Sequence, residues 1–233
     1  LNLIATEYIY SLGKGKKEEY VNLVNRGSRI FNFFIIPLSI GLMIFGPQAI
    51  LVYGSEKYID GGILTSLFAI RTIILALETI LGSQILFING YERRITLYTV
   101  FAGILNLILD SLLYFYDIYT PEYYLITTML SETFLLILYV LFINKRKLIN
   151  LRHILKYTLR YSLFSLTFVL ISFIVNFIYP VQMVINLPLF INMFIIMMLS
   201  VLSYIGLLVW TKDSIFYEFL GHVISLKKRI KKS

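Results

Sequence analysis

The sequence predicts an all-α, polytopic helical membrane protein, and three observations support this fold class. Of the 233 residues, 58% are hydrophobic and only 15% are charged, whereas about 25% of residues are charged in a soluble domain. Six segments are apolar enough for transmembrane helices, which need roughly 20 such residues. The third observation is that lysine and arginine are concentrated in every second segment that connects these helices. A chain this apolar is not a nucleic-acid-binding protein, despite its net charge of +8.

The six predicted transmembrane helices cover most of the chain. The sequence lacks the alternating segments of about ten residues that are typical of transmembrane β-barrels. It also lacks cysteine, which excludes disulfides, thiolate metal sites and cysteine nucleophiles. The predicted spans are residues 31–53, 62–88, 95–116, 123–143, 159–179 and 187–210.

Lysine and arginine residues orient these spans. Nineteen of the 21 lie at the two ends of the chain and in alternate connections, and Lys57 alone lies in a connection of the other set. Because cytoplasmic loops are enriched in lysine and arginine, we expect both termini to be cytoplasmic. The remaining cation, Arg71, lies inside the second predicted span.

The segments between and beyond the spans complete the predicted organisation. Residues 1–30 form a cytoplasmic segment that includes the end of a truncated preceding helix, so we expect the chain to be a fragment of a longer protein. Residues 31–143 form a four-helix core, 144–158 a basic cytoplasmic connection, and 159–210 two additional transmembrane helices. Residues 211–233 form a basic amphipathic cytoplasmic tail, which suits either an anionic membrane surface or an ordinary positive-inside anchor.

Four ionisable residues lie inside the predicted spans, where each charge is costly and is therefore a functional hypothesis. They are Arg71 and Glu78 in the second span, Asp110 in the third and Glu132 in the fourth. Three of them share a similar depth, so the arginine is placed to neutralise one or both carboxylates. Glu78 lies two helical turns from Arg71, too far for a direct bond. The group predicts either a structural ion pair or the wall of a hydrated cavity that recognises a charged substrate or couples to ions.

Helix breakers are concentrated in the first predicted span. Pro37, Gly41, Gly46 and Pro47 all lie within it. A proline inside a helix removes one backbone hydrogen bond and commonly kinks the helix, and transporters bend at such interruptions. These four residues are hinge candidates, and a structural kink is the alternative.

Five stretches in a fixed order carry a family resemblance. They read FFIIPLSIGLMIFGPQAILVYGSEKYIDGG, LFAIRTI, GSQILFINGYERR, GILNLILDSLL and MLSETFLLILYV. This succession resembles the C-terminal lobe of polysaccharide-unit flippases of the Wzx type, within the multidrug/oligosaccharidyl-lipid/polysaccharide exporter superfamily. The last two predicted spans lie beyond the matched part.

The resemblance implies a two-lobed plasma (inner) membrane transporter of 12–14 helices, and no catalytic residue, cofactor or metal. Such a protein moves undecaprenyl-diphosphate-linked oligosaccharide from the cytoplasmic to the outer leaflet by alternating access, in surface polysaccharide biosynthesis. Arg71 is then the substrate-binding candidate, because a guanidinium binds a diphosphate strongly where water is scarce. Glu78, Asp110 and Glu132 are candidates for charge balance or for coupling to a proton or sodium gradient. The implied partners are the lipid-linked oligosaccharide, membrane lipids and other polysaccharide assembly proteins.

Two alternatives remain open at this stage. One is an integral-membrane polysaccharide polymerase or ligase, which needs catalytic groups near the outer leaflet. The short outer loops offer no combination of groups typical of a catalytic site; their charged residues are Glu56, Lys57, Asp60, Asp117 and Glu122. The other alternative is a drug or small-molecule exporter of the same superfamily.

Overall fold

The computed structural model describes residue 7 and residues 13–230, with side chains placed through residue 222, and this part of the chain contains helices but no strand. A single π-helical segment, Thr79–Phe87, continues α3 without a break. A short 3-10 helix, Glu56–Tyr58, connects α2 to α3. The long helices are α2 (Lys17–Gly54), α3 (Gly61–Glu78), α4 (Glu92–Phe115), α5 (Pro121–Arg146), α6 (Arg152–Ile178), α7 (Leu187–Trp210) and α8 (Ser214–Ile230).

The prediction of an all-helical chain with six long apolar helices is confirmed, because α2 to α7 are each long and apolar enough to cross a membrane. Two of these helices begin well before the predicted spans: α2 at Lys17 and α6 at Arg152. An apolar window ends where charged residues begin, whereas lysine, arginine and glutamate are good helix formers and let a helix continue. The predicted end of a preceding helix falls on residues 1–12, which apart from residue 7 lie outside the described residues.

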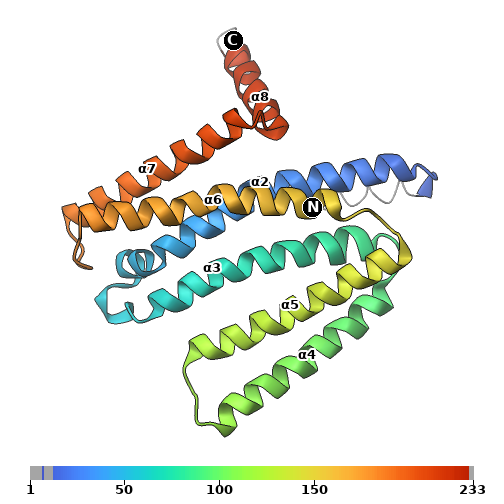
Figure 1. The fold of residues 1–233 in the computed structure, drawn as a ribbon, viewed down its shortest axis with the longest axis horizontal. Coiled ribbons are helices and arrows are strands. Elements are labelled where there is room, and N and C mark those ends of the chain that lie inside the picture. The colour runs from blue at the N-terminus through green and yellow to red at the C-terminus, as the bar shows by residue number, and fades with distance from the viewer. Residues whose placement is uncertain (1–6, 8–12, 231–233) are drawn as a thin grey trace.

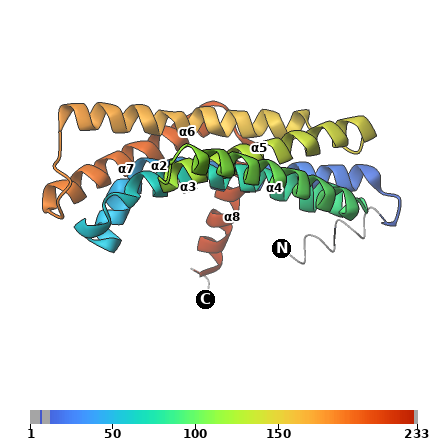
Figure 2. The same cartoon turned by 90° about the horizontal axis from the view of Figure 1, so that it is seen from below.

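The six long apolar helices lie side by side in a shallow slab (Figures 1 and 2). Contacts between neighbours give the order α7, α6, α2, α3, α5 and α4 across the slab. Since successive helices alternate in direction, one end of the slab holds the start of α2 and the α3–α4, α5–α6 and α7–α8 connections. We call this the basic end, because nearly all the cationic residues outside the spans belong to it. The other end is the opposite end.

Two apolar clusters hold the slab together. One lies at the basic end, where α2, the π-helical segment, α4 and α5 meet, and includes the fully buried Tyr20 and Ile85. The second lies between α2, α6, α7 and the start of α8, and includes Ile36 and Leu208. Close packing of this kind is what associates helices in lipid, where apolar surface gains little from leaving its surroundings.

The last helix, α8, leaves the slab and runs transverse to the six long helices (Figures 1 and 2). Its first two turns are anchored. Ile215 is buried in the second apolar cluster, and the ring of Phe219 packs edge-on against the ring of Phe34, with 5.9 Å between the ring centroids. Glu218 forms an exposed ion pair with Arg26 of α2. The predicted tail is therefore helical over residues 214–230, and residues 231–233 lie outside the described residues.

Candidate functional site

The predicted charged group centres on an ion pair between two neighbouring helices. Both α3 and α5 begin at the opposite end, so they run parallel, and Arg71 and Glu132 lie near the middle of each. The Nε of Arg71 donates to both carboxylate oxygens of Glu132, at 2.9 and 3.0 Å, and a terminal nitrogen donates to Oε1 at 2.5 Å. The structure thus pairs the arginine with one of the three intramembrane carboxylates.

This ion pair is only partly enclosed. The side chain of Arg71 is 25% exposed and that of Glu132 is 15% exposed. A guanidinium carries five N–H donors, and two of its three nitrogens bind Glu132. The pair therefore holds the arginine in place, and the third guanidinium nitrogen forms no ion pair with Glu132.

Asp110 belongs to a second polar group, between α4 and α5, rather than to the ion pair. Its carboxylate accepts hydrogen bonds from Thr127 at 2.5 Å and from Asn106, one turn away on α4, at 3.0 Å. The hydroxyl of Ser131 lies 3.5 Å from the Oδ1 of Asn106. Neutral donors thus replace the arginine that the sequence offered as one partner for Asp110.

Glu78 lies nearest of the four residues to the basic end and has a different environment. Its Oε1 atom is buried and has no hydrogen-bond partner among the described residues. Glu78 is the last residue before the π-helical segment, and such segments often occur at functional sites. Within that segment Gly82 packs against Tyr139 of α5, where an added Cβ would lie 3.2 Å from the ring. One carboxylate oxygen of Glu78 thus lacks a hydrogen-bond partner among the described residues, one helical turn from a tight helix contact.

The hinge candidates lie in a helix that runs unbroken through both prolines. Each proline leaves the carbonyl four residues earlier without its helical donor. The hydroxyl of Tyr204 on α7 donates to the carbonyl of Phe33 at 3.1 Å, which replaces the bond lost at Pro37. The hydroxyl of Ser66 on α3 donates to the carbonyl of Met43 at 2.8 Å, which replaces the one lost at Pro47. Neighbouring hydroxyls are a known way for membrane helices to tolerate proline.

The two hinge-candidate glycines have different surroundings. Gly46 lies in the closest contact between α2 and α3, where an added Cβ would lie 2.9 Å from the carbonyl oxygen of Gly62. Gly41 has no atom within 4 Å of such a Cβ, and it lines an apolar groove of about 700 Å³ between α2, α7 and α8. The structure thus places a tight packing point at Gly46-Pro47 and open space beside Pro37 and Gly41.

The sequence analysis missed a buried charge network at the junction of α7 and α8. Asp213 is fully buried and accepts hydrogen bonds from Arg29 at 2.7 Å and from the hydroxyl of Tyr161 at 3.2 Å. The guanidinium of Arg29 also stacks on the ring of Tyr157, 3.9 Å from its centroid. One signal was available: Asp213 is the only acidic residue between Glu132 and Glu218.

The six long apolar helices and the ion pair between Arg71 and Glu132 define a class of protein. This class is the polytopic α-helical membrane protein with ionisable residues inside its apolar helices. Comparison of the chain with protein-family models, with curated proteins and with solved structures finds no match.

Proposed function

We propose that the chain contributes a lobe of a membrane flippase, which carries undecaprenyl-diphosphate-linked oligosaccharide repeat units to the outer leaflet by alternating access. The observation that carries this proposal is the partly open ion pair of Arg71 and Glu132, half-way along two neighbouring helices. An arginine at this depth is costly against lipid tails. The open side of the pair therefore faces water or protein, as in a transport cavity.

The chemistry of the pair fits an exchange of anions. A diphosphate group carries more negative charge than a carboxylate and takes bidentate hydrogen bonds from a guanidinium. When it binds Arg71, it displaces Glu132, which is then free to bind a proton or a sodium ion. Glu78, two helical turns from Arg71 toward the basic end, supplies a second carboxylate for such coupling. When Glu132 releases its proton or sodium ion, its carboxylate is charged again, returns to Arg71 and displaces the substrate.

The prolines of α2 supply the bending that alternating access needs. At Pro37 and Pro47 the helix depends on hydroxyls from α7 and α3 instead of its own amide groups. A side-chain hydroxyl breaks and reforms such a bond without unwinding the helix. In this proposal Pro37, next to the open groove, is the moving point, and the tight contact at Gly46-Pro47 stays fixed.

The first experiment tests whether Arg71 recognises substrate or only stabilises the fold. The double variant Arg71→Met/Glu132→Gln removes both charges, so it leaves no unpaired charge in the membrane. In the native cell we expect it to fold and insert normally but to lower surface polysaccharide at least about tenfold, the effect of losing one strong charge-assisted contact. The lipid-linked repeat unit should accumulate on the cytoplasmic leaflet.

Two controls make the result interpretable. Arg71→Lys keeps the charge and should retain part of the transport, and Arg93→Gln removes an exposed cation at the basic end and should change nothing. Normal export by the double variant would contradict the role of Arg71. Loss of polysaccharide with the repeat unit already on the outer leaflet would favour a polymerase or ligase instead. Loss of drug resistance with normal polysaccharide would favour an exporter of small molecules.

A further inference from the structure

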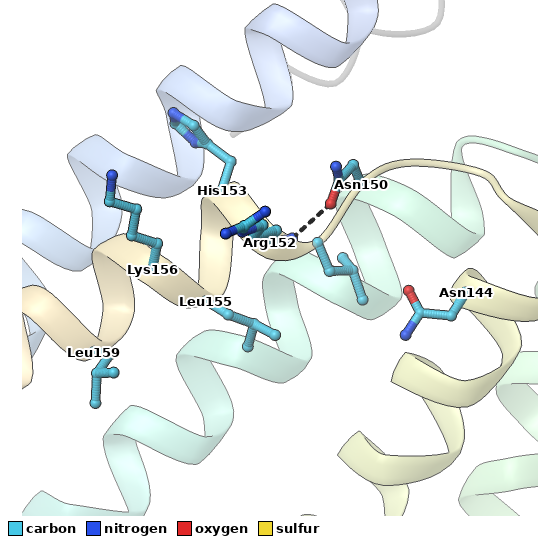
Figure 3. A pocket seen from close by; sticks show the side chains of 8 residues that line it. Asn144, Asn150, Arg152, His153, Leu155, Lys156 and Leu159 are labelled. Atoms are coloured by element: carbon cyan, nitrogen blue, oxygen red, sulfur yellow. Dashed lines mark hydrogen bonds between the residues drawn. The ribbon is translucent and has the colours of Figure 1, made fainter.

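A hollow of about 880 Å³ lies at the basic end, between the last turn of α5 and the first turns of α6. Figure 3 shows Asn144 of α5, Asn150 of the connection and Leu155 of α6 around this space. Arg152, His153, Lys156, Leu151 and Leu159 complete its lining. The Oδ1 atom of Asn150 accepts a hydrogen bond from the backbone amide of Arg152 at 3.0 Å, which fixes the start of α6.

The hollow is strongly cationic. Arg152 and Lys156 line it, and neither forms an ion pair within the part of the chain that the structure describes. A smaller hollow of about 400 Å³ shares Asn144 and Asn150 and adds Lys17 and Lys147 to the same surface. The sequence contains no acidic residue from Thr133 to Lys212, so α6 and the connection before it supply no carboxylate to neutralise Arg152 and Lys156.

An apolar stripe leads from the hollow along α6. Leucines that follow one another at intervals of three or four residues share one face of a helix. All five leucines of this stripe are exposed: Leu155, Leu159, Leu163, Leu166 and Leu170. The apolar part of a ligand whose charged group binds at the hollow can therefore contact these leucines over several helical turns.

We propose that this hollow is a binding site for an anionic phospholipid, distinct from the substrate site at Arg71. The phosphate lies between Arg152 and Lys156 at the start of α6, and one acyl chain follows the leucine stripe. Cationic pockets between membrane helices on the cytoplasmic side bind anionic headgroups in this way. A free phosphate uses only the first half of the site, whereas a lipid uses both.

The test is native mass spectrometry of the purified full-length protein, with vesicles of phosphatidylglycerol or phosphatidylcholine as lipid sources. We expect retained phosphatidylglycerol to exceed phosphatidylcholine, and Arg152→Gln/Lys156→Gln to lower its retention about tenfold, because each cation near a headgroup contributes a few-fold in affinity. The single variant Lys156→Gln changes an exposed side chain and tests the site if the double variant is unstable. Leu159→Gln, in the stripe, should weaken the same retention.

Arg93→Gln/Arg94→Gln is the matched control, because it removes two cations from the same end outside the hollow, and it should retain phosphatidylglycerol. Equal loss in the control would reduce the effect to net charge and overturn the proposal. Equal retention of both lipids would also overturn it. Displacement of phosphatidylglycerol by millimolar inorganic phosphate would show a plain anion site without a role for the acyl chain.

Discussion

Among the described residues, each half of the slab holds an ion pair that is at least partly shielded from solvent, and the two pairs are built differently. In the half formed by α2, α6 and α7, Asp213 is 0% exposed and Arg29 is 12% exposed. In the half formed by α3, α5 and α4, Arg71 and Glu132 keep 25% and 15% of their side-chain surface. The first pair is closed by its neighbours, and the second remains open on one side.

The difference lies in the number of additional donors. Besides Arg29 and Tyr161, the carboxylate of Asp213 accepts hydrogen bonds from the backbone amides of Ile215 and Phe216, at 3.0 and 3.3 Å. Arg160 lies 3.7 Å away and adds a second positive charge. A carboxylate satisfied this completely has no capacity for a ligand. It holds α2, α6 and α8 together, whereas the Arg71–Glu132 pair keeps part of its surface exposed, as the proposed exchange of partners requires.

The largest expected effect is at Asp213. Asp213→Ala leaves Arg29 buried without its carboxylate and removes the acceptor for the first amides of α8. Because breaking a buried pair leaves an uncompensated charge, we expect the free energy of unfolding in detergent micelles to fall by about 3–5 kcal/mol. Asp60→Ala, at an exposed position whose side chain forms no capping hydrogen bond, is the control and should cost less than about 1 kcal/mol. If Glu132→Ala destabilised the protein as much as Asp213→Ala, the distinction between a closed and an open pair would fail.

An intermediate effect is expected where the two halves meet. An alanine Cβ at Gly62 would lie 2.6 Å from the Cα of Pro47, so α2 and α3 must move apart. Overpacking of this kind costs about 1–3 kcal/mol in unfolding free energy. Gly103→Ala on α4, where no atom lies within 4 Å of the new Cβ, should cause no loss. Equal behaviour of the two variants would mean that the halves are not held by this contact.

The smallest effect is expected at the carbonyl freed by Pro37. Tyr204→Phe removes the hydroxyl that binds the carbonyl of Phe33 but keeps the packed ring. Hydrogen bonds between membrane helices contribute about 0.6 kcal/mol on average, and we expect a loss of that size. Tyr116→Phe, on an exposed tyrosine, is the control. Enhanced hydrogen exchange around Pro37 in the Tyr204 variant would support a bending point, and a loss of several kcal/mol would place Tyr204 with the closed network instead.

Much of the charged site can be predicted from the sequence, because the position of a residue within an apolar span predicts its level along the helices. Arg71 and Glu132 lie inside predicted apolar spans, at similar distances from the ends of those spans. Their positions in the spans therefore predict that the two residues lie at the same level. The hydrogen-bond or ion-pair partner of each charged residue cannot be predicted from its level. Asp110 lies near the same level, yet α4 packs mainly against α5 in the slab, and the carboxylate of Asp110 accepts hydrogen bonds from Thr127 and Asn106 instead of from the arginine.

The sequence by itself determined the helical class, the six apolar helices and the depth of the charged residues, because each depends on local composition. The tertiary structure alone decided the order of the helices and the enclosure of Asp213. Arg29 and Asp213 stand 184 positions apart, in segments that look like ordinary charged flanks. They pair because packing α2 against α6 and α7 removes both from water, and a charge without water requires a partner.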